Sequence, residues 1–488
     1  MIMFKSKDAL TEQELQKGLS AIVYDGIMSH LMGVVTGGVF LVALALKLGA
    51  SNFQIGLLAA IPPIMQLTQL PAIYLIEKIR SRKTIAVYGA FISRLGWLLI
   101  AISPFLFSSS VGLSIVIVAV IFQAGLGGIG GCAWHSWMRD LIPENQMGSF
   151  FSKRLRIATV LGIFASLIAS MFIDWWKTSN PSLEIQGYSF LFGVGFVIGI
   201  IGVYFLARTP EIKMVQQDTT FLKLLTEPFK DMNFKRLLVF TGAWSFAINL
   251  AAPFFTVYML SRLGLGLSMI VALSIVSQVF NFMFLGIWGK WTDRYSNKSV
   301  LAVSGPLFLV TILAWTFTTL PDKYVLTMPL LFLIHIVMGI STAGITIASG
   351  NIGLKLAPKG QATAYLAANA LVNSIAAGIA PILGGKFADH LISFKLSFVV
   401  NWSSPCREVS LQTLSFQHWD FFFVFAFLLG LYALHRLSLI KEEGEVDNEV
   451  VRAEFIDVIK RPLRSLSSGA GLFQTISYPF TFLTKKLM

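Results

Sequence analysis

The sequence predicts an all-α integral membrane protein in which twelve transmembrane helices form two pseudo-repeated six-helix bundles. First, 55% of the residues are hydrophobic and only 13% are charged, which excludes an ordinary soluble domain. Second, the chain contains twelve apolar runs of about the 20 residues that a spanning helix requires. A transmembrane β-barrel would show alternating segments of about 10 residues instead. Third, the sequence repeats itself at an offset of about 215 residues.

The twelve runs define the expected helices and the expected domains. In order, the runs lie near 20–47, 53–76, 84–107, 111–138, 155–176, 188–206, 237–262, 267–289, 299–320, 325–348, 361–388 and 417–439. We therefore expect a first six-helix half over 1–206, a central cytoplasmic loop over 207–236, a second half over 237–440 and a cytoplasmic tail over 441–488. The loop before the last run is long and external, and its aromatic residues are expected at the membrane interface.

The repeat rests on three landmarks. Leu48-Gly49-Ala50 returns as Leu263-Gly264-Leu265, Pro143 returns as Pro358, and the charged turn Glu77-Lys78 returns, one residue out of step, as Asp293-Arg294. A duplicated helical half is a common plan for secondary transporters, because two halves can rock about a central site.

The distribution of charge sets the expected topology. The net charge is +13, and roughly 30 of the 38 Lys and Arg residues fall on the side that holds both termini. This positive-inside bias predicts cytoplasmic termini, so the basic excess is topology and no nucleic-acid partner is expected. The first twenty residues do not resemble a cleaved signal, which fits a bacterial cytoplasmic membrane. Cys132 and Cys406 have no metal-ligand spacing, and no cofactor motif is found.

The strongest motif lies in the cytoplasmic loop between the eighth and ninth runs. The segment 289–298 contains Gly289, Asp293, Arg294 and Lys298, and it resembles the Gly-x-x-x-Asp-Arg-x-x-x-Lys loop of the major facilitator superfamily. Its first-half counterpart keeps Glu77 and Lys78 but lacks the glycine. The resemblance covers roughly 19–440 and implies twelve helices and alternating access, with these two loops as a conformational lock. A plain positive-inside turn is the alternative.

Two glycine-rich segments are interpreted as packing elements. Ala380-Pro381-Ile382-Leu383-Gly384-Gly385 resembles an element that superfamily antiporters carry in their fifth span, but here it lies in the eleventh run. It predicts a bend or close helix packing. The run 125–131 has no Lys-Ser/Thr sequel and lies inside an apolar stretch, so it is not a phosphate-binding loop. Gly127 and Gly131 have helix-packing spacing instead.

Ionisable residues inside the apolar runs are the main functional candidates, because each is costly in hydrocarbon. Arg94 lies about ten residues into the third run, roughly 15 Å deep at the helical rise. Asp25 in the first run is the obvious acidic residue of the first half. An Asp25–Arg94 pair would neutralise both. Its functional interpretation is coupling to a proton or to the substrate, and the alternative is a structural ion pair with Asp25 solvated near the cytoplasmic end.

If the resemblance holds, the first, fourth, seventh and tenth runs line the substrate cavity. The polar residues nearest their middle are His30, Gln123, Asn249 and His335. Such a ring suits a polar or weakly charged ligand, and either histidine titrates in a range that allows it to carry a proton. The alternative is that each histidine is bonded only to a backbone carbonyl.

The sequence therefore predicts a secondary active transporter that moves a small organic solute by alternating access, is coupled to protons and works as a monomer in the lipid bilayer. The substrate and the direction of transport stay open. One competing class is a non-transporting scaffold on a transporter fold, for which the tail 441–488 is the motivation. Another is a lipid-acting membrane enzyme, for which His418-Trp419-Asp420 is the only candidate site.

Overall fold

The computed structural model describes residues 6–8, 10–143, 146–214, 227–319, 323–358, 362–404 and 407–442. In this part of the chain, twelve helical segments are long and apolar enough to cross a membrane. Each of the twelve predicted runs overlaps one of them, so the helical, twelve-span fold class is confirmed. The chain is a multi-pass integral membrane protein. The predicted tail beyond Glu442 and much of the central loop lie outside the described residues.

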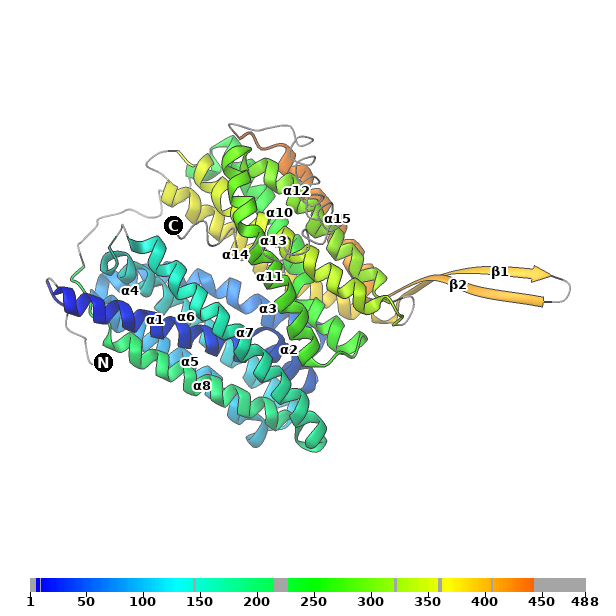
Figure 1. Cartoon of the computed structure of the whole chain (residues 1–488), viewed down its shortest axis with the longest axis horizontal. Helices are drawn as coiled ribbons and strands as arrows, with labels where there is room; N and C mark the ends of the chain where they lie inside the picture. Colours follow the sequence, from blue (N-terminus) through cyan, green and yellow to red (C-terminus); the bar gives the residue numbers. More distant parts are fainter. Residues whose placement is uncertain are drawn as a thin grey trace, which may run out of the picture. The chain divides into compact units, whose positions relative to one another are not determined.

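The first six spans contain eight α-helices (Figure 1). They are α1 (Glu12–Thr36), α2 (Gly38–Lys47), α3 (Asn52–Met65), α4 (Gln69–Ile79), α5 (Arg82–Leu106), α6 (Ser109–Leu141), α7 (Met147–Ser179) and α8 (Glu184–Arg208). The first span is broken between α1 and α2, where Gly38 has φ +51°. The second is broken between α3 and α4 by the 3-10 turn Gln66–Thr68, which follows two prolines that cannot donate helical hydrogen bonds.

The last six spans are built from six α-helices. They are α10 (Met232–Val257), α11 (Leu267–Arg294), α12 (Asn297–Ala314), α13 (Thr327–Leu356), α14 (Ala362–His390) and α15 (Trp419–Ser438). A π-helical turn over Tyr258–Arg262 extends α10. Because successive spans cross in opposite directions, the N-termini of α1, α5, α10 and α12 lie on one side of the membrane, which we call the terminal side. The N-termini of α3 and α11 lie on the opposite side.

The backbone reproduces the sequence repeat on the opposite side. Gly49, before α3, has φ +87°, and Gly264, before α11, has φ +56°. Both values lie in the left-handed region, where a residue with a Cβ atom is strained and glycine is not. The two equivalent turns therefore need glycine for the same conformational reason.

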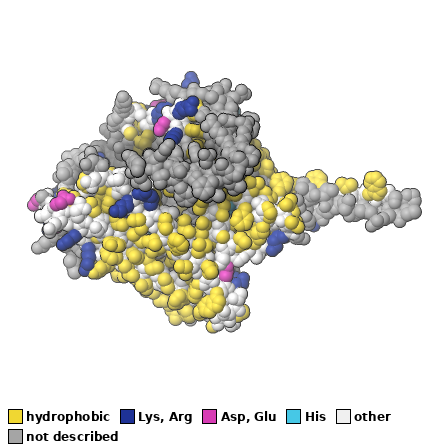
Figure 2. Space-filling view, in the orientation of Figure 1, with side chains coloured by type: hydrophobic (Ala, Val, Ile, Leu, Met, Phe, Trp, Pro, Cys, Tyr) yellow, Lys and Arg dark blue, Asp and Glu magenta, His cyan; other side chains and the backbone are white. Residues whose placement is uncertain are grey.

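Much of the helix surface is apolar. Along α7, Phe164, Ile168 and Met171 are all more than half exposed, and their spacing of four and three residues places them on one helix face. Figure 2 shows hydrophobic side chains spread over the visible face of the helices. A face of this kind is stable only against lipid or another apolar surface, which fits a membrane-spanning bundle.

The described chain divides into two compact units, each of which is considered by itself. The first contains 1–220, 245–272 and 371–422, and the second contains 221–244, 273–370 and 423–488. The first unit thus combines the first sequence half with short parts of the second. The predicted division into two sequence halves remains a prediction.

A β-hairpin, which the sequence analysis did not predict, joins α14 to α15. Strand β1 (Lys395–Ser404) pairs antiparallel with β2 (Arg407–Gln417), and the register shifts at Phe398 and Val399. The hairpin extends away from the helices in Figure 1. In β1, Phe398, Val400 and Trp402 are at least half exposed. The predicted external aromatic loop is therefore regular β-structure.

Glycines allow close approach between helices, although the predicted pair is not the one that does so. An added Cβ atom would meet nothing within 4 Å at Gly127 or Gly131, whereas at Gly128 it would lie 2.5 Å from the Thr68 hydroxyl. The packing prediction for Gly127 and Gly131 is wrong, because the face of α6 that touches its neighbours is one residue away. Close packing at 380–385 is confirmed, since a Cβ atom on Gly384 would lie 2.8 Å from the Leu250 carbonyl oxygen.

Candidate functional site

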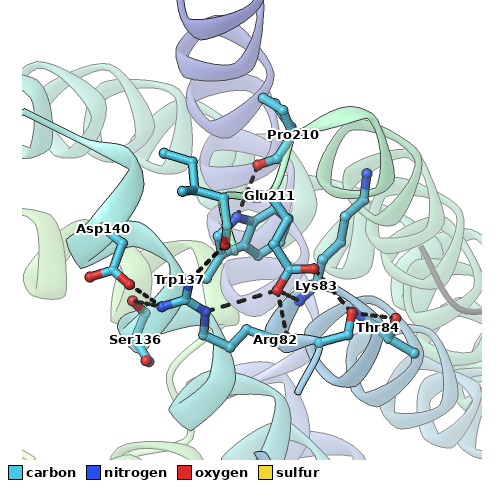
Figure 3. A network of polar contacts seen from close by, with 10 residues as sticks. Arg82, Lys83, Thr84, Ser136, Trp137, Asp140, Pro210 and Glu211 are labelled. Atoms are coloured by element: carbon cyan, nitrogen blue, oxygen red, sulfur yellow. Dashed lines mark hydrogen bonds and ion pairs between the residues drawn. The ribbon is translucent and has the colours of Figure 1, made fainter. Parts of the chain in front are cut away.

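On the terminal side of the first unit, a buried glutamate closes the N-terminus of α5 (Figure 3). Glu211, three residues after α8, is 2% exposed. Its Oε1 accepts hydrogen bonds from the backbone N–H groups of Arg82, at 2.6 Å, and Lys83, at 3.1 Å. Its Oε2 accepts a hydrogen bond from the Ser81 hydroxyl at 3.0 Å. A carboxylate is favoured here because the first N–H groups of a helix have no partner within the helix.

The Arg82 side chain connects this cap to α6. Its guanidinium forms an ion pair with Asp140 and donates to the Ser136 carbonyl at 3.1 Å and to the Ile212 carbonyl at 3.0 Å. Its Nε also lies 3.9 Å from Glu211 Oε1. One buried arginine therefore joins the start of α5, the end of α6 and the segment after α8 (Figure 3).

The second unit contains the same arrangement at the N-terminus of α12. Glu442 accepts hydrogen bonds from the backbone N–H groups of Asn297, at 3.2 Å, and Lys298, at 2.7 Å. The ammonium group of Lys355 lies 3.1 Å from its Oε1. Asn297, Lys298 and Lys355 follow Arg82, Lys83 and Asp140 by the repeat offset of 215 residues. Glu442 therefore belongs to the helical body and not to the predicted tail.

Two more carboxylates cap helices on the opposite side, and all of the residues involved belong to the first unit. Asp174 near the end of α7 accepts hydrogen bonds from the N–H groups of Leu267, at 3.0 Å, and Ser268, at 2.8 Å, at the start of α11. Asp389 near the end of α14 accepts hydrogen bonds from the N–H groups of Asn52 and Phe53, at 3.0 and 2.8 Å, at the start of α3.

The two opposite-side caps are equivalent under the repeat. Asp389 follows Asp174 by 215 residues, and Leu267 follows Asn52 by the same interval. Each cap joins a helix end from one sequence half to a helix start from the other. Beside the Asp389 cap the backbones touch, since a Cβ atom on Gly385 would lie 2.3 Å from the Asn52 carbonyl oxygen and one on Gly56 would lie 2.0 Å from the Pro381 carbonyl oxygen.

Within the spans of the first unit, the structure brings Asp25 and Arg94 together. The Arg94 Nη2 lies 3.7 Å from Asp25 Oδ1 and donates a hydrogen bond to the Ser29 hydroxyl at 2.8 Å. Ser29 donates in turn to Asp25 Oδ1 at 3.2 Å. Asp25 is 4% exposed and Arg94 is 5% exposed. The alternative of a solvated Asp25 is therefore wrong, because α1 packs this residue against its neighbouring helices.

A third member of this charge cluster, Arg154 on α7, was not predicted. Its Nη2 lies 4.0 Å from Asp25 Oδ2, its Nε donates to the Ile22 carbonyl at 3.3 Å, and its guanidinium lies 5.0 Å from the centre of the Trp134 ring. The sequence gives a weak signal, since Arg154 stands eight residues inside α7. In the sequence it directly precedes the apolar run that begins at Leu155, a position typical of an interfacial basic residue.

The four predicted cavity residues are divided between the two units, so the ring they were expected to form remains a prediction. His30 and Gln123 are half-buried in the first unit. Asn249, in the same unit, donates from Nδ2 to the Ser245 carbonyl at 2.8 Å. His335 lies in the second unit, where its Nδ1 is 2.8 Å from the Leu331 carbonyl oxygen and its ring contacts Trp315. That geometry is typical of a structural histidine in a membrane helix.

The predicted lock residues have different surroundings. Lys298 is buried and donates from Nζ to the Ser438 carbonyl at 3.2 Å and the Ile440 carbonyl at 2.7 Å. Asp293 and Arg294 are exposed, with the Arg294 guanidinium over the Tyr295 ring. Glu77 and Lys78 are exposed, and Gly289 is half-buried. Within the predicted lock, Lys298 also contributes its backbone N–H to the Glu442 cap.

The candidate enzyme triplet has a local structural role. His418 has φ +36°, and its ring packs against Trp419. Burial lowers the pKa of its imidazole below the ordinary range. Asp420 accepts a hydrogen bond from the Gln417 N–H at 2.8 Å, as expected for a carboxylate at the start of α15. Among the described residues, no group of three His, Cys, Asp or Glu side chains is arranged to hold a metal ion.

A known protein family matches this chain. The family model described as Major Facilitator Superfamily matches residues 26–381. No curated protein sequence matches the chain.

Several solved structures share the fold. A mutant of the nucleoside transporter NupG has 14% identity and a TM-score of 0.63, over 87% of this chain and 100% of that chain. A bacterial homologue of the iron transporter ferroportin, in an inward-facing state, has 11% identity and a TM-score of 0.60, over 88% and 98%. A bacterial homologue of the human lysosomal transporter Spinster has 16% identity and a TM-score of 0.56, over 78% and 84%. At these identities the likeness shows the fold alone.

Proposed function

Because the chain belongs to the Major Facilitator Superfamily, we propose that it is a secondary transporter that moves a small organic solute by alternating access and is driven by protons. We also propose that the terminal side is cytoplasmic, since roughly 30 of the 38 Lys and Arg residues fall on that side. The membrane would then be a bacterial cytoplasmic membrane.

The observation that carries the proposal is the pair of opposite-side carboxylate caps. Asp174 and Asp389 occupy equivalent positions of the repeat and each accepts two backbone N–H bonds from a helix of the other sequence half. Alternating access requires contacts of this kind, which hold one side closed in one state and separate in the other. Hydrogen bonds to backbone groups at helix ends separate without unfolding either helix.

For proton coupling we place the carrier at Asp25. It is buried, and the guanidinium groups of Arg94 and Arg154 both approach it. A buried carboxylate that gains or loses a proton changes its attraction for these two guanidinium groups, and it is therefore suited to couple proton binding to transport. His335 is a weaker candidate, because its ring nitrogen is already engaged by the Leu331 carbonyl.

The test uses purified protein in proteoliposomes that contain a pH-sensitive dye and are challenged with a broad solute panel. We expect solute-dependent proton entry in the wild type and in a His335→Gln control, and solute movement without pH dependence in Asp25→Asn. Saturable uptake of a labelled solute without proton movement would contradict proton coupling but support the transport function. Unchanged proton-driven flux in Asp25→Asn would eliminate Asp25 as the carrier. No response to any solute would contradict transport of small organic solutes.

A further inference from the structure

The charge cluster around Asp25 contains more positive than negative charge. Arg94 approaches the carboxylate from α5 at 3.7 Å, and Arg154 approaches it from α7 at 4.0 Å. The two distances place both guanidinium groups beside the same carboxylate. With all three groups ionised, the cluster therefore carries a net charge of +1. A charge in a buried setting is costly unless a counter-charge accompanies it.

Arg94 also has unused hydrogen-bonding capacity. In the described part of the chain its Nη1 is buried and has no hydrogen-bond partner, although Nη2 is bonded to Ser29. Five N–H donors of a guanidinium are normally satisfied when the side chain is buried. The unpartnered donor belongs to a residue that is only 5% exposed, so among the described residues this buried N–H group has no acceptor.

Arg154 is the more accessible member of the cluster. About 22% of its side chain is exposed, against 6% for Arg94. Its guanidinium crosses the α1 backbone at Gly26, where an added Cβ atom would lie 1.8 Å from Nε. The indole nitrogen of Trp134, whose ring lies beneath this guanidinium, is a second buried donor with no acceptor in the described structure.

We propose that Arg94 and Arg154 bind the acid group of a small organic anion carrying one carboxylate, and that this anion is the transported solute. The inference rests on the proposed transport function and narrows its substrate class. A carboxylate supplies the missing negative charge, and its two oxygens match the planar fork of a guanidinium. It also provides an acceptor for the free donor of Arg94.

The same geometry couples the anion to a proton. Protonation of Asp25 raises the net charge of the cluster from +1 to +2, so the anion binds more tightly when Asp25 carries a proton. The groups that face Asp25 are Arg94 from α5, Arg154 from α7 and Ser29 from α1 itself. From α8, the uncharged Gly202 lies beside Asp25, since an added Cβ atom there would lie 3.5 Å from Oδ1. His30 and His135 also lie within electrostatic range of Arg154.

The experiment compares acids with their neutral amides of nearly equal size, in the intact protein reconstituted in nanodiscs. Lactate is paired with lactamide, and benzoate with benzamide, and binding is measured by calorimetry between pH 5.5 and 8. We expect at least a tenfold preference for one acid over its amide, tighter binding at low pH, and loss of the preference in Arg94→Gln. Arg94→Lys should keep part of it. Asp25→Asn should bind the acid with little pH dependence.

The outcomes separate the substrate class from the function. Equal binding of acid and amide, or an acid preference that survives both Arg94→Gln and Arg154→Gln, would overturn the anion site. If amides alone are transported in the proteoliposome assay described above, the transport function is supported and the proposed anionic substrate is contradicted. If no acid in the panel binds, the proposal for small monocarboxylates is wrong. A thermal melt on each variant distinguishes lost binding from lost folding.

Discussion

Substitution of Asp174 and Asp389 by asparagine should open the opposite side of the molecule. Each carboxylate accepts two backbone N–H bonds at the start of a helix. Asparagine keeps one carbonyl oxygen, so each substitution loses one of the two hydrogen bonds and the charge that the helix dipole favours. Under the proposed alternating access, a state closed on the opposite side contains these bonds and a state open on that side lacks them.

The magnitude follows from the number of bonds lost. A hydrogen bond to a charged group contributes about 1.5–3 kcal/mol, so each substitution should weaken the closed state by about 2 kcal/mol. The two caps share no residue, so their effects should add to about 4 kcal/mol in the double variant. Since about 1.4 kcal/mol is a tenfold change in an equilibrium constant, the ratio of open to closed molecules should rise roughly 10³-fold.

The assay is a spin-label distance measurement in nanodiscs. Labels at the exposed positions Phe107 and Ile392, in a background with Cys132→Ser and Cys406→Ser, report on the opposite side within the first unit. We expect a longer distance to gain population in each single variant and to dominate in the double variant.

A control at another helix cap separates this effect from the loss of a carboxylate charge at a helix start. Asp231 caps its own helix, α10, by accepting hydrogen bonds from the N–H groups of Asn233, at 2.9 Å, and Phe234, at 3.0 Å. Asp231→Asn should leave the measured distances unchanged. The proposed role of Asp174 and Asp389 would be refuted if the double variant kept the wild-type distance distribution. It would also be refuted if Asp231→Asn changed that distribution equally.

Three further outcomes are expected. Glu211→Gln leaves Arg82 with less counter-charge and should lower the free energy of unfolding by about 2–4 kcal/mol. The measurement is the melting temperature, which should fall. As a control, Glu184→Gln affects a partly exposed ion pair with Lys47 and should change the free energy of unfolding by less than about 1 kcal/mol. Gly385→Ala should disfavour the closed opposite side in the spin-label assay, because its Cβ atom would lie 2.3 Å from the Asn52 carbonyl oxygen, and Gly33→Ala, with nothing within 4 Å, should have no effect. Replacing residues 397–415 by a short Gly/Ser linker should leave the melting temperature within about 2 °C, since Phe398, Val400 and Trp402 are at least half exposed.

The spans were predictable because hydrocarbon imposes one simple rule on the sequence. A spanning helix must be apolar over about 20 residues, and that requirement is visible without knowledge of any partner. The repeat was visible for a related reason, since Gly49 and Gly264 both hold positive φ angles that other residues adopt at a cost. Local backbone requirements leave local sequence signals.

The caps were not predicted because they join residues that are distant in the sequence. Asp389 lies 337 residues from Asn52, and a single aspartate at the end of an apolar run has the same appearance as any interfacial charge. One signal was available, because Asp174 and Asp389 share the repeat offset, as do Ser81-Arg82-Lys83-Thr84 and Ser296-Asn297-Lys298-Ser299. Aligning the two halves at this offset pairs the two aspartates and the two helix starts, although Glu211 and Glu442 do not share the offset.

The hairpin was missed for another physical reason. Its strands pair apolar with apolar residues, as in Phe398 with Leu414 and Val400 with Leu411, but a register shift separates the two pairs. The alternation in β2 therefore breaks in the middle, and a bulge of this kind is not visible in a search for period two.

The four carboxylate caps have the same chemistry, but they differ in whether the capped helix belongs to the same sequence half as the carboxylate. We expect their roles to differ for this reason. Glu211 and Glu442 each cap a helix of their own sequence half, so movement of one half against the other leaves these bonds intact. Asp174 and Asp389 each cap a helix of the other half, so the same movement must break both together. We therefore expect the glutamates to stabilise each half and the aspartates to control the proposed conformational equilibrium. A substitution at Glu211 should change the melting temperature more than the distance distribution, and a substitution at Asp389 should do the reverse.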